Sequence, residues 1–154
     1  MEHLRNIKIA VDFDGTIVEH EYPKIGKDML FAIETLKELI KHGALIILWT
    51  FRSGAELEDA VEYCRKKGVE FYAVNRNYPE EVYDDSLSRK INADVFIDDK
   101  NVGGFPGWSN IWQMLSLYEE MEKEAEKVLS RRTPLFRRLF GKRLKNPDKN
   151  ENQN

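Results

Sequence analysis

The stretch from Ile7 to Thr16 constrains the fold of this chain more than any other segment. It reads Ile-Lys-Ile-Ala-Val-Asp-Phe-Asp-Gly-Thr, a short apolar run that ends in two aspartates and a glycine. Such a run is typical of a strand buried in a parallel sheet. Residues two apart in a strand face the same side, so Asp12 and Asp14 should face one space before Gly15 turns the chain away. An Asp-rich turn that closes a hairpin is the alternative interpretation.

The two carboxylates predict a bound cation. Two like charges about 4 Å apart repel by about 4 kcal/mol at an effective dielectric constant near 20. Either one carboxyl is therefore protonated or a cation is shared between them. Because no Cys or His stands in this stretch, the hard oxygen donors of Asp12 and Asp14 favour Mg²⁺ over Zn²⁺.

Apolar runs and helical patterns alternate along the rest of the chain. We expect further strands at 44–49, 69–74 and 95–97. We expect helices at 27–42, 55–67 and 109–129, the last capped by Ser109, and a short helix at 80–87. This order predicts an α/β fold with a doubly wound, mostly parallel sheet and helices on both of its faces.

Polar side chains follow three of the four predicted strands. They are Asp12 and Asp14, then Thr50, then Asp98 and Asp99. Because parallel strands end at a common edge, we expect these groups to converge there, where open α/β sheets bind their ligands.

The charge distribution divides the chain into a domain at 1–130 and a basic tail at 131–154. The net charge is −3, but the tail holds eight Lys and Arg against Asp148 and Glu151, which leaves the first 130 residues at about −9. We expect the tail to be partly helical or disordered, with its apolar residues docked on the domain. Contact with a nucleic acid, a membrane surface or a partner groove is the alternative.

Targeting signals are absent from the sequence pattern. No run of about 18 apolar residues occurs, and the first residues lack the apolar stretch of a signal peptide. We therefore expect a cytoplasmic protein without a transmembrane segment. A single cysteine, Cys64, excludes an internal disulfide.

The residues Asp12-Phe13-Asp14-Gly15-Thr16 after a strand resemble the first signature of the haloacid dehalogenase (HAD) superfamily, in its phosphatase branch. The resemblance implies a Rossmann-like core in which Asp12 is the nucleophile and Asp14 the general acid/base. It also implies that Thr50 binds the transferring phosphate, and that Asp12, Asp98 or Asp99, and the backbone carbonyl of Asp14 hold Mg²⁺. The matching elements run in order from Asp12 to Asp99, about two-thirds of the chain.

The cation that neutralises the phosphate has more than one candidate in the sequence. Lys90, eight residues before Asp98, fits the family pattern best, and Arg89 and Lys100 remain alternatives. Arg52 has two interpretations, a contact to a substrate phosphate or sugar and a surface salt bridge.

These features predict a Mg²⁺-dependent phosphohydrolase that cleaves a phosphate monoester through an aspartyl-phosphate on Asp12. The alternatives are a phosphotransferase that uses the same intermediate and a catalytically silent module that binds a phosphorylated ligand. The intervals after the first two strands leave no room for the cap domain common in HAD phosphatases. Capless members of that family act on macromolecular substrates or oligomerise, so small and macromolecular substrates and a homo-oligomer all remain open. A short flap at 19–26 is expected to screen the site.

Overall fold

The computed structural model describes residues 2–82, 84 and 86–131 of the chain. The chain divides into two units, Met1–Ser116 and Leu117–Asn154. The first unit contains the sheet, and the described part of the second continues the last helix. Of the predicted basic tail at 131–154, all but the first residue lies outside the described residues, so the tail stays a prediction.

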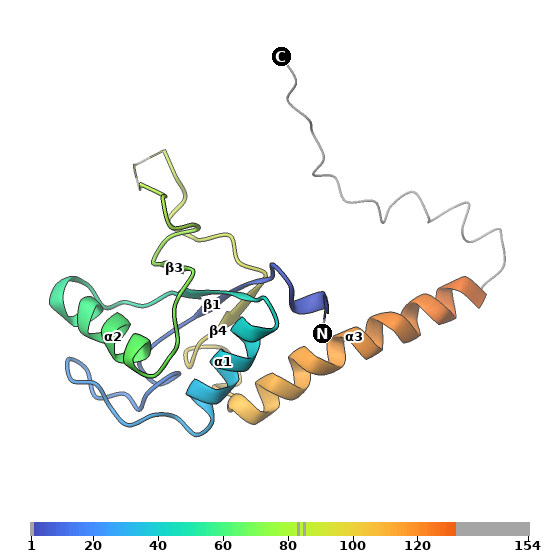
Figure 1. Cartoon of the computed structure of the whole chain (residues 1–154), viewed down its shortest axis with the longest axis horizontal. Coiled ribbons are helices and arrows are strands. Elements are labelled where there is room, and N and C mark those ends of the chain that lie inside the picture. The colour runs from blue at the N-terminus through green and yellow to red at the C-terminus, as the bar shows by residue number, and fades with distance from the viewer. Residues whose placement is uncertain (1, 83, 85, 132–154) are drawn as a thin grey trace, which may run out of the picture. The chain divides into compact units, whose positions relative to one another are not determined.

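The first unit is built on a sheet of four parallel strands (Figure 1). The strands are β1 (Lys8–Val11), β2 (Leu45–Leu48), β3 (Ala73–Val74) and β4 (Val95–Ile97), in the spatial order β3-β2-β1-β4. A 3₁₀ turn, η1 (Glu2–Leu4), precedes them, and the helices are α1 (Ala32–Lys41), α2 (Gly54–Lys66) and α3 (Trp108–Arg131). The predicted α/β, doubly wound, Rossmann-like fold is confirmed. No cap domain is inserted between the strands in the part of the chain that the structure describes.

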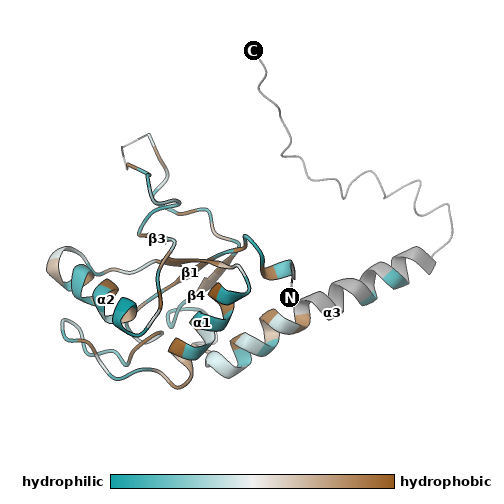
Figure 2. Cartoon of the chain, in the orientation of Figure 1, coloured by the Kyte–Doolittle hydropathy of each residue, from teal (hydrophilic) through white to brown (hydrophobic). Residues whose placement is uncertain are grey.

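The sheet is largely buried on both faces because its strands are apolar apart from Lys8, as the mainly brown strands of Figure 2 show. Phe96 in β4 is the exposed exception among the apolar residues. Alternate residues of β1 belong to different clusters of buried side chains. Ile9 and Val11 pack in a large cluster, whereas Ala10 packs in a small one. This two-sided burial explains why the strands lack the alternation of a half-exposed sheet.

The two faces of the sheet are covered differently. From β1 the chain passes through α1 to β2 and through α2 to β3, and the buried residues of both helices join the large cluster. Segment 75–94 then returns to β4 on the other side of β1, and a right-handed crossover in this direction covers the opposite face. Ile91 and Ala93 from this segment pack in the small cluster. Helices were expected on both faces, but among the described residues all three helices contribute to the large cluster, and Ile91 and Ala93 on the second face lie outside any helix.

Several predicted element bounds also differ from the structure. The helix predicted at 27–42 begins at Ala32, because Lys27 and Met29 bond back to the chain at Glu19 and Ile17. The last helix begins at Trp108, so Ser109 lies inside its first turn and is not its cap. The strand predicted at 69–74 keeps only its last two residues, and the described residues of 80–87 form turns instead of a helix.

None of the helices in the described residues combines the length and the apolar character that a membrane crossing requires.

Candidate functional site

The predicted polar strand ends meet at one edge of the sheet. β1 lies between β2 and β4, so Asp12, Thr50 and Asp98 follow three neighbouring strands. The backbone N–H of Asp12 donates to the carbonyl of Ile97, which extends the pairing to the first aspartate. The expected convergence is confirmed, because Asp12, Asp14, Thr50 and Asp98 all line a single cleft.

Three carboxylates form a tight group at this edge, here called the carboxylate cluster: Asp12, Asp98 and Asp99. One oxygen from each lies within 4.8 Å of the others. Oδ1 of Asp99 is buried and has no hydrogen-bond partner, while its Oδ2 accepts a 2.7 Å hydrogen bond from Nζ of Lys100. Oδ1 of Asp98 accepts from the backbone N–H of Lys100 at 2.7 Å.

Asp12 is unusually hard to ionise. The pKa of its carboxyl is raised from 3.8 to about 6, chiefly because the group is buried. The neighbouring charges of Asp98, Asp99 and Asp14 contribute to this rise in pKa, and a hydrogen bond from the backbone of Phe13 opposes it. A cation would relieve this repulsion.

The donor set fits a hard divalent cation. All three side chains of the cluster offer oxygen, as Mg²⁺ prefers, and neither His nor Cys belongs to it. Buried polar atoms are normally hydrogen-bonded, so the buried oxygen of Asp99 that has no partner is a candidate metal ligand. The residues present therefore suit Mg²⁺.

Gly15 allows Asp99 to approach the first strand. Its φ is +84°, a left-handed conformation, and a Cβ atom added there would lie 2.5 Å from Oδ2 of Asp99. Only glycine meets both conditions. The Asp-Gly step in the first motif thus turns the chain and also leaves space for the third carboxylate.

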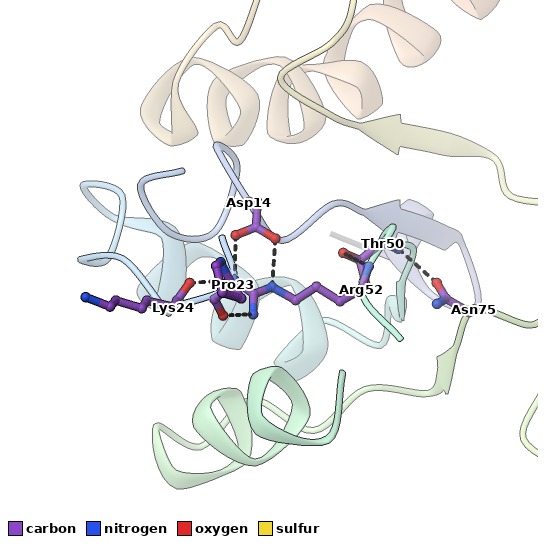
Figure 3. Close-up of polar contacts among 6 residues, drawn as sticks. All are labelled: Asp14, Pro23, Lys24, Thr50, Arg52 and Asn75. Carbon is purple, nitrogen blue, oxygen red and sulfur yellow. Dashed lines mark hydrogen bonds and ion pairs between the residues drawn. The ribbon is translucent and has the colours of Figure 1, made fainter. Parts of the chain in front are cut away.

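Asp14 belongs to a different arrangement from the cluster (Figure 3). Its two oxygens accept hydrogen bonds from Nε and Nη2 of Arg52, both at 2.7 Å. Arg52 also donates to the backbone carbonyls of Pro23 (2.9 Å) and Lys24 (2.7 Å) in the predicted flap. The hydrogen bond to Asp14 raises the pKa of the guanidinium. Here we define the clamp as Asp14, Arg52 and these two carbonyls.

The clamp differs from both interpretations of Arg52 drawn from the sequence. Arg52 is only 2% exposed, so its ion pair with Asp14 is buried and does not lie on the surface. It borders the cleft, but four of its hydrogen bonds go to protein atoms. A substrate contact by Arg52 remains a prediction.

Thr50 is fixed by its neighbours. Its backbone N–H donates to Oδ1 of Asn75 at 2.8 Å, and its hydroxyl oxygen accepts from the backbone N–H of Arg52 at 3.3 Å. Sequence reasoning missed Asn75, although it follows β3 as Thr50 follows β2. Thr50 was selected because it is a polar residue that follows a strand, and Asn75 meets the same criterion.

The cleft has a volume of about 730 Å³. Its cationic side chains are Arg89 and Lys100, the two alternatives to Lys90, together with Arg52. Lys90 is exposed and is not among the residues that line the cleft. His20 and Tyr22 from the flap also line the cleft, together with Trp49 and Phe51.

Comparison with known proteins identifies a relative. No protein-family model matches the chain, and no curated protein does. A solved structure matches with a TM-score of 0.69 and 54% sequence identity, over 73% of this chain and 91% of the other. It is described as the structure of the conserved protein coded by a locus from Bacteroides thetaiotaomicron. This chain belongs to the same family. This similarity supports the α/β fold of the chain, and the relative's description names no function.

Proposed function

We propose that this protein is a Mg²⁺-dependent phosphohydrolase of the HAD type that cleaves a phosphate monoester. The observation that carries the proposal is the carboxylate cluster of Asp12, Asp98 and Asp99, with its buried, unpartnered oxygen on Asp99. A cluster of three acids alone is weak support. Its place at the carboxyl edge of a parallel sheet, in one cleft with Thr50 and cationic side chains, makes the proposal specific.

Asp12, Asp98 and Asp99 would hold the ion, with the backbone carbonyl of Asp14. When bound, Mg²⁺ would offset the repulsion between an anionic phosphate and the carboxylates.

In the first step, a carboxylate oxygen of Asp12 attacks phosphorus. The bond from phosphorus to the ester oxygen breaks, and Asp14, protonated at the start of this step, delivers its proton to the departing alcohol. Both oxygens of Asp14 accept hydrogen bonds from Arg52, so one of these bonds must open for Asp14 to carry that proton, which comes from solvent in the first cycle and from the attacking water in later ones. Arg52 meanwhile orients the carboxyl group toward the cleft.

In the second step, Asp14 takes a proton from water, whose oxygen attacks the phosphorus of the aspartyl-phosphate. The bond to Asp12 breaks, which restores its carboxylate and releases inorganic phosphate. Thr50, Lys100 and Arg89 line the same cleft, which supports a role for them in binding the non-bridging oxygens as charge develops. The cleft is open enough to leave Phe51 98% exposed, so water has access and hydrolysis is favoured over transfer to another alcohol.

Phosphate release from a panel of monoesters, with Mg²⁺ and with a chelator, tests this proposal. We expect release to require Mg²⁺ and to fall to background in Asp12→Asn. Asp14→Asn should lower kcat by about 10² to 10⁴, the usual contribution of a general acid/base. Asp59→Asn is the matched control, because this exposed aspartate on α2 does not border the cleft.

A second readout tests the covalent intermediate. Rapid acid quench during turnover should trap phosphate on the wild-type protein, and hydroxylamine should release it, as it does from acyl phosphates. Release of phosphate that persists in Asp12→Asn, or that is unaffected by chelation, would contradict the proposal.

A further inference from the structure

Aromatic residues line the cleft in addition to the acidic and cationic ones. Tyr22, Trp49 and Phe51 line it together with His20. We call the first three residues the aromatic wall. Phe51 is 98% exposed and Tyr22 is 50% exposed, so these rings present apolar surface to whatever enters. A single exposed phenylalanine is ordinary, but here two exposed rings line one cleft together with Trp49, which is partly buried and also packs on the small cluster. Together they form a surface suited to a ligand.

The backbone around Phe51 fixes its outward position. The N–H of Thr50 is bound by Asn75, and the N–H of Arg52 is bound by the hydroxyl of Thr50. Arg52 is drawn inward by Asp14, which leaves the residue between them facing solvent. A large apolar side chain loses about 1.5–3 kcal/mol of stabilisation when it is exposed instead of buried, so this position has a cost to stability.

Tyr22 is fixed by the clamp. The guanidinium carbon of Arg52 lies 5.2 Å from the centre of the Tyr22 ring, in a cation–π contact. Arg52 also binds the carbonyls of Pro23 and Lys24, the next two residues of the flap. The ring is therefore positioned before any ligand arrives, which lowers the entropic cost of binding.

The size of the cleft leaves room for more than a phosphate. Its volume of about 730 Å³ lies within the range of roughly 300–1,000 Å³ typical of sites for small organic ligands. With the phosphate near Thr50 and the carboxylate cluster, the rest of the ligand would extend along the aromatic wall. Phe51 directly follows Thr50, so a ring linked to that phosphate falls within reach of the phenyl face.

We propose that the aromatic wall binds a planar ring of the substrate, so that the preferred substrate is a monoester such as a nucleoside 5′-monophosphate. This inference rests on the proposed function for its phosphate end. Every base has a π-face, so stacking on Phe51 selects for a ring without selecting one base. A second copy of this chain would have to cover the charged groups of the same cleft, which disfavours a subunit contact there.

A pair of substrates that differ only in the ring tests the proposal. Adenosine 5′-monophosphate and ribose 5-phosphate share the phosphate and the sugar. We expect kcat/KM to be about 5- to 100-fold higher for the nucleotide, in line with base–aromatic stacking. Phe51→Ala should bring this ratio close to one, and Phe51→Trp should restore it. Leu30→Ala, at a residue 76% exposed and outside the cleft, should leave the ratio unchanged.

A binding measurement separates failure of this inference from failure of the proposed function. Calorimetry on the full chain with Mg²⁺, in the Asp12→Asn background, should give tighter binding of the nucleotide than of ribose 5-phosphate, with a difference that Phe51→Ala removes. This holds whether or not either compound is hydrolysed. Equal affinities for the nucleotide and ribose 5-phosphate would contradict the proposal that the aromatic wall binds a ring, and would not affect the proposed hydrolysis. Conversion of a dimer to a monomer by Phe51→Ala, seen by light scattering, would also overturn it.

Discussion

Asp12 and Asp14 stand two residues apart on one turn, yet they lie in opposite electrostatic surroundings. Asp12 faces Asp98 and Asp99, and its pKa is raised to about 6. Asp14 receives two hydrogen bonds from the buried guanidinium of Arg52. One carboxylate is surrounded by like charges and the other has its countercharge in place. The charge of Asp12 is thus left for an external cation to neutralise, whereas the charge of Asp14 is neutralised by Arg52 of the protein itself.

The difference has an energetic meaning. A buried ion pair is strongly destabilised when only one partner is removed, because the other charge stays behind. A group among like charges behaves in the opposite way, since removal of its charge relieves repulsion. The carboxylate cluster therefore reduces the stability of the metal-free fold, whereas the clamp maintains it.

The largest expected effect comes from breaking the clamp. Arg52→Ala leaves Asp14 without its countercharge and the carbonyls of Pro23 and Lys24 without their donors. We expect a loss of about 3–5 kcal/mol in the free energy of unfolding, measured by urea denaturation at pH 7. Arg65→Ala is the matched control, because Arg65 forms an exposed pair with Glu62 on α2 and its removal should lower the free energy of unfolding far less. Equal losses in the two variants would show that the clamp contributes no more than a surface pair.

The two arrangements also differ in how far they were predictable. The polar strand ends follow from local rules, since the two-residue period of a strand and the shared edge of parallel strands place Asp12, Thr50 and Asp98 together. Those rules do not specify the spatial order of the four strands, which depends on the crossover connections. The clamp joins residues 38 positions apart through the path of the flap, and no local pattern in the sequence encodes that path.

The crossover at 75–94, which is irregular in its described residues, explains most of the remaining differences. Spacing from Asp98 favours Lys90, but a segment without periodicity does not reveal which side chain faces the site. Arg89 and Lys100 border the cleft instead. The absence of a helix over the described residues of 80–87 has the same origin, because Asn77 links this loop: it donates to Glu81 and accepts from the backbone N–H of Asn92.

The sharpest test of the comparison is the same substitution made at both aspartates. With the metal removed by a chelator, Asp12→Asn should stabilise the fold at pH 8 and Asp14→Asn should destabilise it by about 3 kcal/mol. A pKa raised from 3.8 to about 6 corresponds to at most about 3 kcal/mol, and solvent screening of this partly exposed group reduces the gain to about 1–2 kcal/mol.

The pH dependence gives the sign of the Asp12 effect. The carboxyl is harder to ionise in the folded state, so the folded protein loses stability as the pH rises through about 6. Below about pH 3.8 both states are protonated, and the advantage of Asp12→Asn should disappear. Thermal unfolding from pH 4 to pH 8 measures this difference. A stabilisation that stays constant over that range would exclude ionisation of Asp12 as its cause.

The smallest expected effect comes from adding the cation itself. Mg²⁺ at ten times its dissociation constant should stabilise the wild-type protein by about 1.4 kcal/mol, by mass action on the folded state alone. Asp99→Asn should remove most of this gain, because it replaces the unpartnered oxygen with an amide group of the same shape. Asp94→Asn changes an aspartate beside the amino end of β1, where it accepts a hydrogen bond from the N–H of Lys8, and should keep the gain. The shift in melting temperature with Mg²⁺ concentration measures how much of the protein has bound the ion, and it requires no turnover. If Mg²⁺ still stabilised Asp99→Asn, the cation would have to bind outside the carboxylate cluster.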